Sequence, residues 1–217
     1  MACLERPEDY LSIRGREESV RGGLKNRPGF FGGTMKLNIH SWDKRDFLGI
    51  ILRCTKAERG AEIGVYAGEL SELLLRGIPD LKLHLIDPYR HFPKEVYDDL
   101  ANSDQDVQDA RYEYVCKLFA KNENVEILRL TSEEAAPKIP DESLDFVYID
   151  ANHAYEFVKR DIELWWPKVK QHGILAGHDY TQPQVAAAVI NSNLSEEIHW
   201  LTAGDIWMVS KGKDVFK

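Results

Sequence analysis

The sequence contains little cysteine, no long hydrophobic run and no excess of positive charge. Its three cysteines, Cys3, Cys54 and Cys116, form neither a close pair nor the spacing of a metal site, so we expect free thiols in a reducing compartment. No apolar run reaches the length of a membrane span, and the N-terminus lacks the apolar core of a signal peptide. The net charge of −8 argues against a nucleic-acid partner. These absences predict a cytoplasmic protein that acts on neither membranes nor nucleic acids.

The rest of the composition is that of an ordinary globular protein. The length of 217 residues suits one α/β domain, and 43% of the residues are hydrophobic. Residues 1–34 are rich in Arg, Glu and Gly and offer little to bury, which predicts a flexible N-terminal arm before a compact domain over residues 35–217. The alternative for the arm is a lid in which Phe30 and Phe31 fold over a substrate.

The stretch from residue 59 to residue 71 predicts a strand, a glycine turn and the start of a helix. The strand covers residues 61–65, the turn runs from Gly64 to Gly68, and apolar residues at helical spacing begin at Leu70. Glycines let a bound molecule approach the backbone, and the free N–H groups of a helix start face that molecule. The stretch is therefore a candidate ligand site, with a plain structural turn as the alternative.

The residues around these glycines indicate which ligand the turn binds. A dinucleotide site requires Gly-x-Gly-x-x-Gly, but Tyr66 and Glu69 interrupt that spacing. Glu62, on the strand, favours a ligand with a cationic ammonium or sulfonium group. The run Glu-Ile-Gly-Val-Tyr-Ala-Gly resembles the first motif of class I S-adenosylmethionine-dependent methyltransferases. That resemblance implies S-adenosyl-L-methionine as cofactor, with S-adenosyl-L-homocysteine as product, bound by Glu62, Gly64, Tyr66 and Gly68.

The second predicted strand, residues 81–87, ends in an acid about twenty residues after the turn. Asp87 can accept hydrogen bonds from both ribose hydroxyls of a nucleoside, in NAD enzymes and in methyltransferases alike. Capping of the turn before Pro88 is the alternative. Residues 88–103 contain several aromatic residues, which we expect either to contact adenosine or substrate or to pack against one another.

The third predicted strand, residues 125–130, is followed by a helix start. Thr131 to Glu134 form a capping box. The methyltransferase resemblance implies that Ser132 holds the adenine edge of the cofactor.

Polar residues follow two further predicted strands. Residues 144–149 form a central strand that leads into Asp150-Ala151-Asn152-His153. A helix over residues 158–169, ended by Gly173, connects it to a fifth strand over residues 174–177, which leads into His178-Asp179-Tyr180. Because the carboxyl ends of parallel strands meet at one edge of a sheet, we expect these polar groups to lie close together.

Together these segments resemble one family closely. The runs Phe-Val-Tyr-Ile-Asp-Ala-Asn-His-Ala-Tyr-Glu, Val-Lys-Arg-Asp-Ile-Glu-Leu-Trp and Gly-Ile-Leu-Ala-Gly-His-Asp-Tyr are similar to methyltransferase family 24, which includes sugar and macrolide-sugar O-methyltransferases. The match runs from about residue 40 to residue 211. One departure is Ala151-Asn152 in place of Gly-Asp, so Asn152 is not expected to bind a metal.

The resemblance implies methyl transfer to an oxygen of a sugar, a glycan or a sugar-bearing small molecule. A sugar hydroxyl needs a general base or a metal to become a nucleophile at neutral pH. We expect His153 to act as the base beside Asp150, which also borders the cofactor, and Asp150 and Asp179 to bind Mg²⁺. The alternatives are a helix-capping role for His153 and carboxylates that bind substrate hydroxyls directly.

The chain ends in two short β runs, residues 199–201 and 206–210, that predict a hairpin. Such a hairpin is the antiparallel edge of class I methyltransferases. The expected fold is an α/β Rossmann-like, doubly wound, seven-stranded sheet of order 3-2-1-4-5-7-6, with only the last strand antiparallel and with helices on both faces. An NAD-dependent oxidoreductase and a non-catalytic nucleoside-binding protein are the alternative functions, and a homodimer is the oligomer that we allow for.

Overall fold

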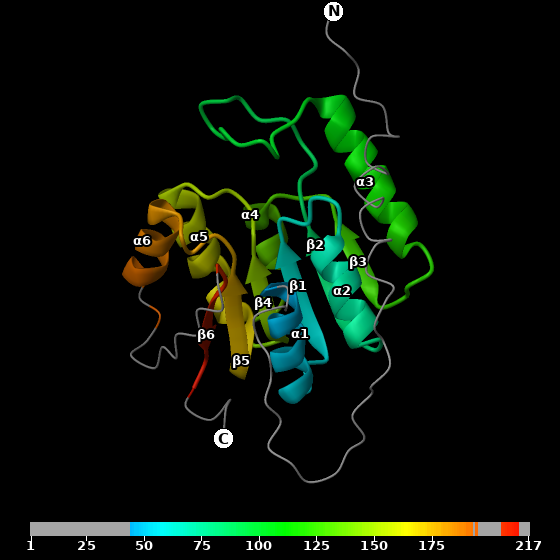
Figure 1. Ribbon diagram of the computed structural model, residues 1–217, viewed down its shortest axis with the longest axis vertical. Helices are drawn as coiled ribbons and strands as arrows, with labels where there is room; N and C mark the ends of the chain where they lie inside the picture. Colours follow the sequence, from blue (N-terminus) through cyan, green and yellow to red (C-terminus); the bar gives the residue numbers. More distant parts are fainter. Residues whose placement is uncertain (1–43, 193, 195–204, 213–217) are drawn as a thin grey trace, which may run out of the picture. The chain divides into compact units, whose positions relative to one another are not determined.

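The structure is a computed structural model that describes residues 44–192, 194 and 205–212 (Figure 1). The chain divides into two units, residues 1–40 and residues 41–217, and all described residues belong to the second unit. The predicted arm over residues 1–34 and the predicted strand over residues 199–201 lie outside the described residues.

The described residues form one sheet of six strands in the order β3-β2-β1-β4-β5-β6. All neighbouring pairs are parallel except β5 and β6, which are antiparallel. This arrangement confirms the Rossmann-like fold, including the antiparallel last strand beside the fifth. Six strands are described where seven were expected, because the remaining strand was expected within the residues not described. The strands are β1 (Arg59–Ile63), β2 (Lys82–Ile86), β3 (Val125–Leu128), β4 (Leu144–Ile149), β5 (Val169–Gly177) and β6 (Trp207–Ser210).

Helices cover both faces of the sheet, as a doubly wound topology requires. One face packs against α1 (Lys44–Cys54), α2 (Glu69–Gly77) and α3 (Gln105–Phe119). The other face packs against α4 (Ser132–Ala135), α5 (Tyr155–Trp165) and α6 (Pro183–Asn191). Short 3₁₀ turns follow α4 at Ala136–Lys138 and α5 at Trp166–Lys168. None of the helices among the described residues is long and apolar enough to cross a membrane.

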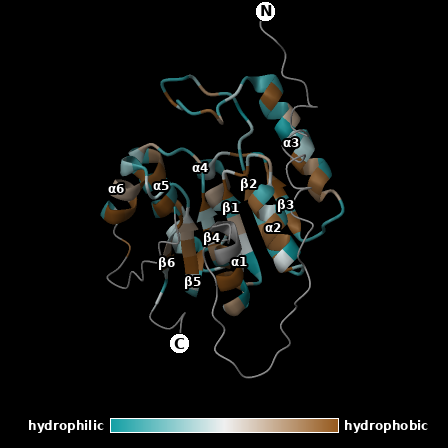
Figure 2. Ribbon diagram, in the orientation of Figure 1, coloured by the Kyte–Doolittle hydropathy of each residue, from teal (hydrophilic) through white to brown (hydrophobic). Residues whose placement is uncertain are grey.

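The central strand β4 is apolar on both sides because its successive side chains point to opposite faces of the sheet and helices cover both faces. Phe146 and Tyr148 of β4 pack into the core under α1 and α2, whereas Val147 and Ile149 pack into the core under α5 and α6. All four side chains are buried. Figure 2 shows hydrophobic residues along β3 and β5 as well, as expected for strands covered by helices on both faces.

The boundary between α5 and β5 differs from the prediction. The helix expected over residues 158–169 ends at Trp165, and β5 begins at Val169 rather than at Ile174. Pro167 has no backbone N–H and its ring clashes with the preceding helical turn, so the chain leaves the helix there. Gly173 therefore lies inside β5 instead of ending a helix. A Cβ atom at Gly173 would lie 2.8 Å from the carbonyl oxygen of Asp145, so the close approach of β4 requires glycine.

Candidate functional site

Two adjoining cavities lie at the carboxyl ends of β1, β2 and β4. The first has a volume of about 250 Å³ and reaches from the glycine turn past Asp87 to α4 and α5. The second has a volume of about 540 Å³ and extends from the glycine turn toward His153. Gly64, Tyr66 and Asp150 line both cavities, so the two form a continuous site at this edge of the sheet. The segment between β2 and α3 lies above the same edge (Figure 1) and contributes Tyr97 to both cavities.

The backbone of the glycine turn takes a conformation that only glycine adopts easily. Gly64 and Gly68 have φ angles of 86° and 78°, in the left-handed region, and Gly68 is the N-cap of α2. A Cβ atom at Gly64 would lie 2.0 Å from the carbonyl oxygen of Asp150. Gly64 thus allows β1 and β4 to end side by side at the cavity. Tyr66 also has a positive φ, of 53°, and its side chain is 42% exposed.

Asp87 lies at the first cavity and is held by backbone N–H groups. Its Oδ2 accepts hydrogen bonds from the N–H groups of Val65 and Tyr66, each over 3.0 Å, and its Oδ1 accepts one from Tyr89 N–H over 2.8 Å. Burial raises the pKa of Asp87 above its ordinary value, and these three N–H groups oppose that rise. The predicted ribose-binding acid is therefore near the glycine turn, and it also fixes the conformation of that turn.

Glu62 lies at the second cavity on the other side of the turn. The side chain is buried, with 3% exposure, and it accepts a hydrogen bond from the hydroxyl of Ser71 in α2. An acid in this position can attract the ammonium group of a methionine moiety. The hydrogen bond between Ser71 and Glu62 also holds α2 against the end of β1.

Ser132 lies in the wall of the first cavity and takes part in a buried chain of hydrogen bonds. Trp165 Nε1 donates to Ser132 Oγ over 2.8 Å, and the Ser132 hydroxyl donates to Asp161 Oδ1. Burial raises the pKa of Asp161 to about 7. The predicted capping box between Thr131 and Glu134 is present, which fixes the start of α4 beside the cavity.

Asp161 was not predicted as a site residue. The sequence contained a signal for it, because Asp161 falls among the inward positions of α5 that also include Val158, Ile162 and Trp165. A buried acid on the apolar side of a helix is unusual and often functional.

His153 lies between carboxylates at the far end of the second cavity. Its Nε2 is 2.8 Å from Asp179 Oδ2 and 3.7 Å from Asp150 Oδ1, and its Nδ1 is 3.3 Å from Asp99 Oδ2. The three carboxylates, Asp150 first, raise the pKa of His153 above its ordinary value, against the effect of burial. Nε2 is buried without a hydrogen-bond partner of suitable geometry among the described residues. The structure thus brings together His153, Asp150 and Asp179, as the sequence predicts.

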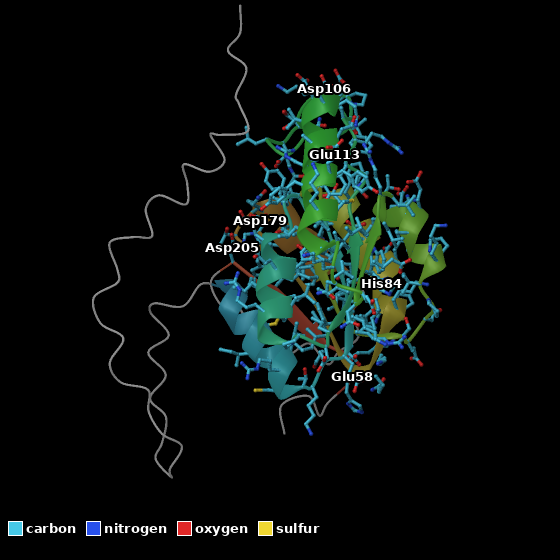
Figure 3. All side chains as sticks on the ribbon, turned by 90° about the vertical axis from the view of Figure 1, so that its right-hand side faces the viewer. Glu58, His84, Asp106, Glu113, Asp179 and Asp205 are labelled. Carbon is cyan, nitrogen blue, oxygen red and sulfur yellow. The ribbon has the colours of Figure 1, made fainter. Side chains whose placement is uncertain are left out.

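The same residues fit a metal ion. One ligand atom from each of Asp150, His153 and Asp179 lies within 4.8 Å of the others, and His153 Nε2 is the imidazole nitrogen that faces both carboxylates. His178, Asp179 and Asp205 form a second such group. Figure 3 shows Asp179 and Asp205 close together and far from Glu58, which directly precedes β1. Two carboxylates and one imidazole are a donor set that divalent metals accept.

Arg111 of α3 is a second residue that sequence reasoning missed. Its guanidinium stacks 4.2 Å from the ring centroid of Tyr66 and donates to the Tyr66 hydroxyl over 3.1 Å. It also donates to Ala101 O over 2.9 Å and to Ser103 Oγ over 3.0 Å. Arg111 therefore holds the segment between β2 and α3 against the glycine turn. No motif marks it, since its partners are distant in sequence.

Comparisons with known proteins identify the family of this fold and site. The family model Methyltransf_24, described as a methyltransferase domain, matches residues 61–180. A search of curated proteins finds no match.

Three solved structures share the fold. The O-methyltransferase NovP is 21% identical, with a TM-score of 0.58 over 78% of this chain and 80% of its own. TomG from Streptomyces achromogenes, an O-methyltransferase of tomaymycin synthesis in complex with SAM, is 14% identical, with a TM-score of 0.56 over 78% and 80% of the two chains. The SAH-bound methyltransferase PaMTH1 from Podospora anserina is 12% identical, with a TM-score of 0.56 over 78% of each chain.

Proposed function

We propose that this chain, which belongs to the methyltransferase-domain family, transfers a methyl group from S-adenosylmethionine to a hydroxyl oxygen of a sugar, a glycan or a sugar-bearing small molecule. The observation that carries the proposal is the position of the acid–histidine cluster. Asp150 lines both cavities and His153 lines the second, so a carboxylate and a base border the site where a cofactor methyl group would lie, and Asp179 lies 2.8 Å from that base.

The cavities suit the two ends of the cofactor. The first, between Asp87 and Ser132, is proposed to hold adenosine, with the ribose hydroxyls at Asp87. The methionine part would cross the glycine turn into the second cavity, where Glu62 offers a negative charge to its ammonium group. TomG with SAM and PaMTH1 with SAH support this choice of cofactor, because both share the fold.

The acceptor hydroxyl must lose its proton as the carbon–oxygen bond forms. We propose that the His153 imidazole takes this proton, since the residue lines the second cavity and carboxylates hold its ring in place. A divalent metal such as Mg²⁺ bound by Asp150 and Asp179 would lower the pKa of the acceptor hydroxyl. The carboxylate groups of these two residues also hold the imidazole in place.

Exposed apolar side chains surround the cavities and support an acceptor that carries an apolar group beside its sugar. Val96 and Phe157 at the first cavity are 45% and 40% exposed, and Leu100 at the second is 98% exposed. Solvent-exposed apolar side chains of this size commonly mark a ligand surface when they gather. We propose a small-molecule or glycan acceptor and a cytoplasmic reaction, with a homodimer as the assembly to be tested.

A methyl-transfer assay tests this function. The full-length protein is incubated with S-adenosylmethionine labelled in the methyl group and with free sugars, nucleotide-linked sugars and glycosylated apolar molecules, with EDTA or with added Mg²⁺. We expect label in a glycosylated acceptor, and loss of transfer in EDTA that Mg²⁺ restores. Binding of S-adenosylhomocysteine without transfer to any acceptor would favour a non-catalytic protein, whereas thermal stabilisation by NAD alone would favour an oxidoreductase.

A further inference from the structure

Asp161 is a buried acid in the wall of the first cavity. The residue is 6% exposed, yet it lines the cavity together with Ser132 and Glu133. It comes from α5, whereas its neighbours follow β3, so two elements meet at this end of the cavity. Asp87, which we propose binds the ribose, lines the same cavity.

The hydrogen bonds around Asp161 leave its carboxyl group incompletely paired. Oδ1 accepts from the Ser132 hydroxyl, and among the described residues the Asp161 carboxyl group has no other hydrogen bond and no ion pair. The neighbouring Arg160 pairs with Glu133 instead. The carboxyl group lines the cavity, and its second oxygen has no hydrogen-bond partner among the described residues, so this oxygen is available to a ligand in the cavity.

The Ser132 hydroxyl is fixed beside this carboxyl group. It donates its proton to Asp161 and accepts from Trp165 Nε1 over 2.8 Å, which leaves one lone pair of Oγ. Both Asp161 Oδ2 and Ser132 Oγ thus remain available as acceptors. Together they match a ligand group that donates two hydrogen bonds, which is what an exocyclic amino group offers.

We propose that Asp161 selects adenine in the cofactor by accepting a hydrogen bond from its 6-amino group through Oδ2, with Ser132 Oγ as the neighbouring acceptor. This inference rests on the proposed binding of S-adenosylmethionine with its ribose at Asp87. It assigns a specificity role to a residue of α5.

The test compares S-adenosylhomocysteine with S-inosylhomocysteine, in which an oxygen replaces the 6-amino group. Dissociation constants for both ligands are measured by calorimetry with the wild-type protein, with Asp161→Asn and with the matched control Glu163→Gln. Glu163 is an exposed acid of the same helix that does not line the first cavity. We expect the wild type and Glu163→Gln to prefer the adenine ligand by at least about tenfold, as for an unpaired buried polar group. In Asp161→Asn this ratio should fall at least fivefold.

If the role of Asp161 is only structural, Asp161→Asn weakens the binding of both ligands equally. The ratio of the two dissociation constants then stays at its wild-type value, which would overturn the inference. If Asp161→Asn does not fold, the wild type decides the question, because equal affinities for the two ligands exclude selection of the amino group. Failure of the wild type to bind either nucleoside would overturn the proposed function itself and this inference with it. Binding of both with equal affinity would overturn only the inference.

Discussion

The carboxylate of Asp87 accepts a hydrogen bond from the backbone N–H of Tyr66 over 3.0 Å, which joins the end of β2 to the glycine turn after β1. The same oxygen accepts from Val65 N–H, and the other accepts from Tyr89 N–H. One acid therefore holds two backbone segments, the glycine turn and the chain after β2, beside the cavity that we assign to adenosine. Its contribution to stability and its contribution to binding can be separated.

Replacing Asp87 with alanine is expected to lower both stability and cofactor affinity. The three backbone N–H groups lose a charged acceptor, which costs about 2 kcal/mol by the usual value for such bonds. For a protein of this size that corresponds to a loss of about 4–8 °C in Tm. Tm is measured by differential scanning fluorimetry with and without S-adenosylhomocysteine, which should stabilise the variant far less than the wild type. The control is Asp80→Ala, an exposed acid just before β2. Equal behaviour of the two variants would contradict the role of Asp87.

Gly64→Ala should disrupt the site more than an alanine at another glycine. The added Cβ atom would lie 2.0 Å from Asp150 O, and the φ of 86° disfavours any residue with a side chain. Gly77, the last residue of α2, has no atom within 4 Å of an added Cβ, so Gly77→Ala is the matched control. We expect Gly77→Ala to keep the wild-type Tm, and Gly64→Ala to lose soluble protein or cofactor binding. A Gly64→Ala variant with wild-type affinity would show that β1 and β4 need not approach so closely.

His153→Ala distinguishes a base from a metal ligand. Because Nε2 lies 2.8 Å from Asp179 Oδ2 and belongs to a metal-capable group, both roles fit the geometry. If His153 is the base, we expect its replacement to lower kcat by about 10²-fold or more. Cofactor affinity and the Mg²⁺ concentration for half-maximal activity should not change. A ligand role predicts instead that this Mg²⁺ concentration rises and that excess metal restores the rate. His84→Ala, at a histidine of β2 that does not line either cavity, is the control.

The pH dependence of stability should contain a contribution from Asp161. Its pKa is about 7 in the folded protein against an ordinary value of 3.8, so between these pH values the folded form keeps a proton that the unfolded form releases. The stabilisation from this group is fully present below about pH 4 and is lost as the pH rises through about 7. We expect the free energy of unfolding to fall by about 1 kcal/mol per pH unit between pH 5 and pH 7 because of this residue.

Urea unfolding of the wild type and Asp161→Asn at pH 5, 6, 7 and 8 isolates that contribution, since other titrating groups cancel in the difference. The difference in free energy of unfolding between the two proteins should change with pH below 7 and level off above it. A difference that is constant across this range would mean that Asp161 titrates alike in the folded and unfolded states.

The sequence by itself determined the order of strands and helices and the residues at the strand ends. Alternating and continuous apolar runs marked β1, β2, β3 and β4, and the glycines at 64 and 68 marked the turn, because backbone conformation and burial depend mainly on local residue types. The end of α5 was missed, although Pro167 signalled it, because the apolar spacing continued through Val169.

Only the tertiary structure decided which of these residues meet. Asp161 and Ser132 are separated by 29 residues, and Arg111 and Tyr66 by 45, so no local pattern relates them. Their contacts depend on how α5 and α3 pack against the sheet, which is a matter of side-chain shape across the whole core. The same holds for His153, whose position 2.8 Å from Asp179 depends on β4 and β5 ending side by side. Sequence could therefore name the polar residues at the sheet edge, but it could not assign their partners.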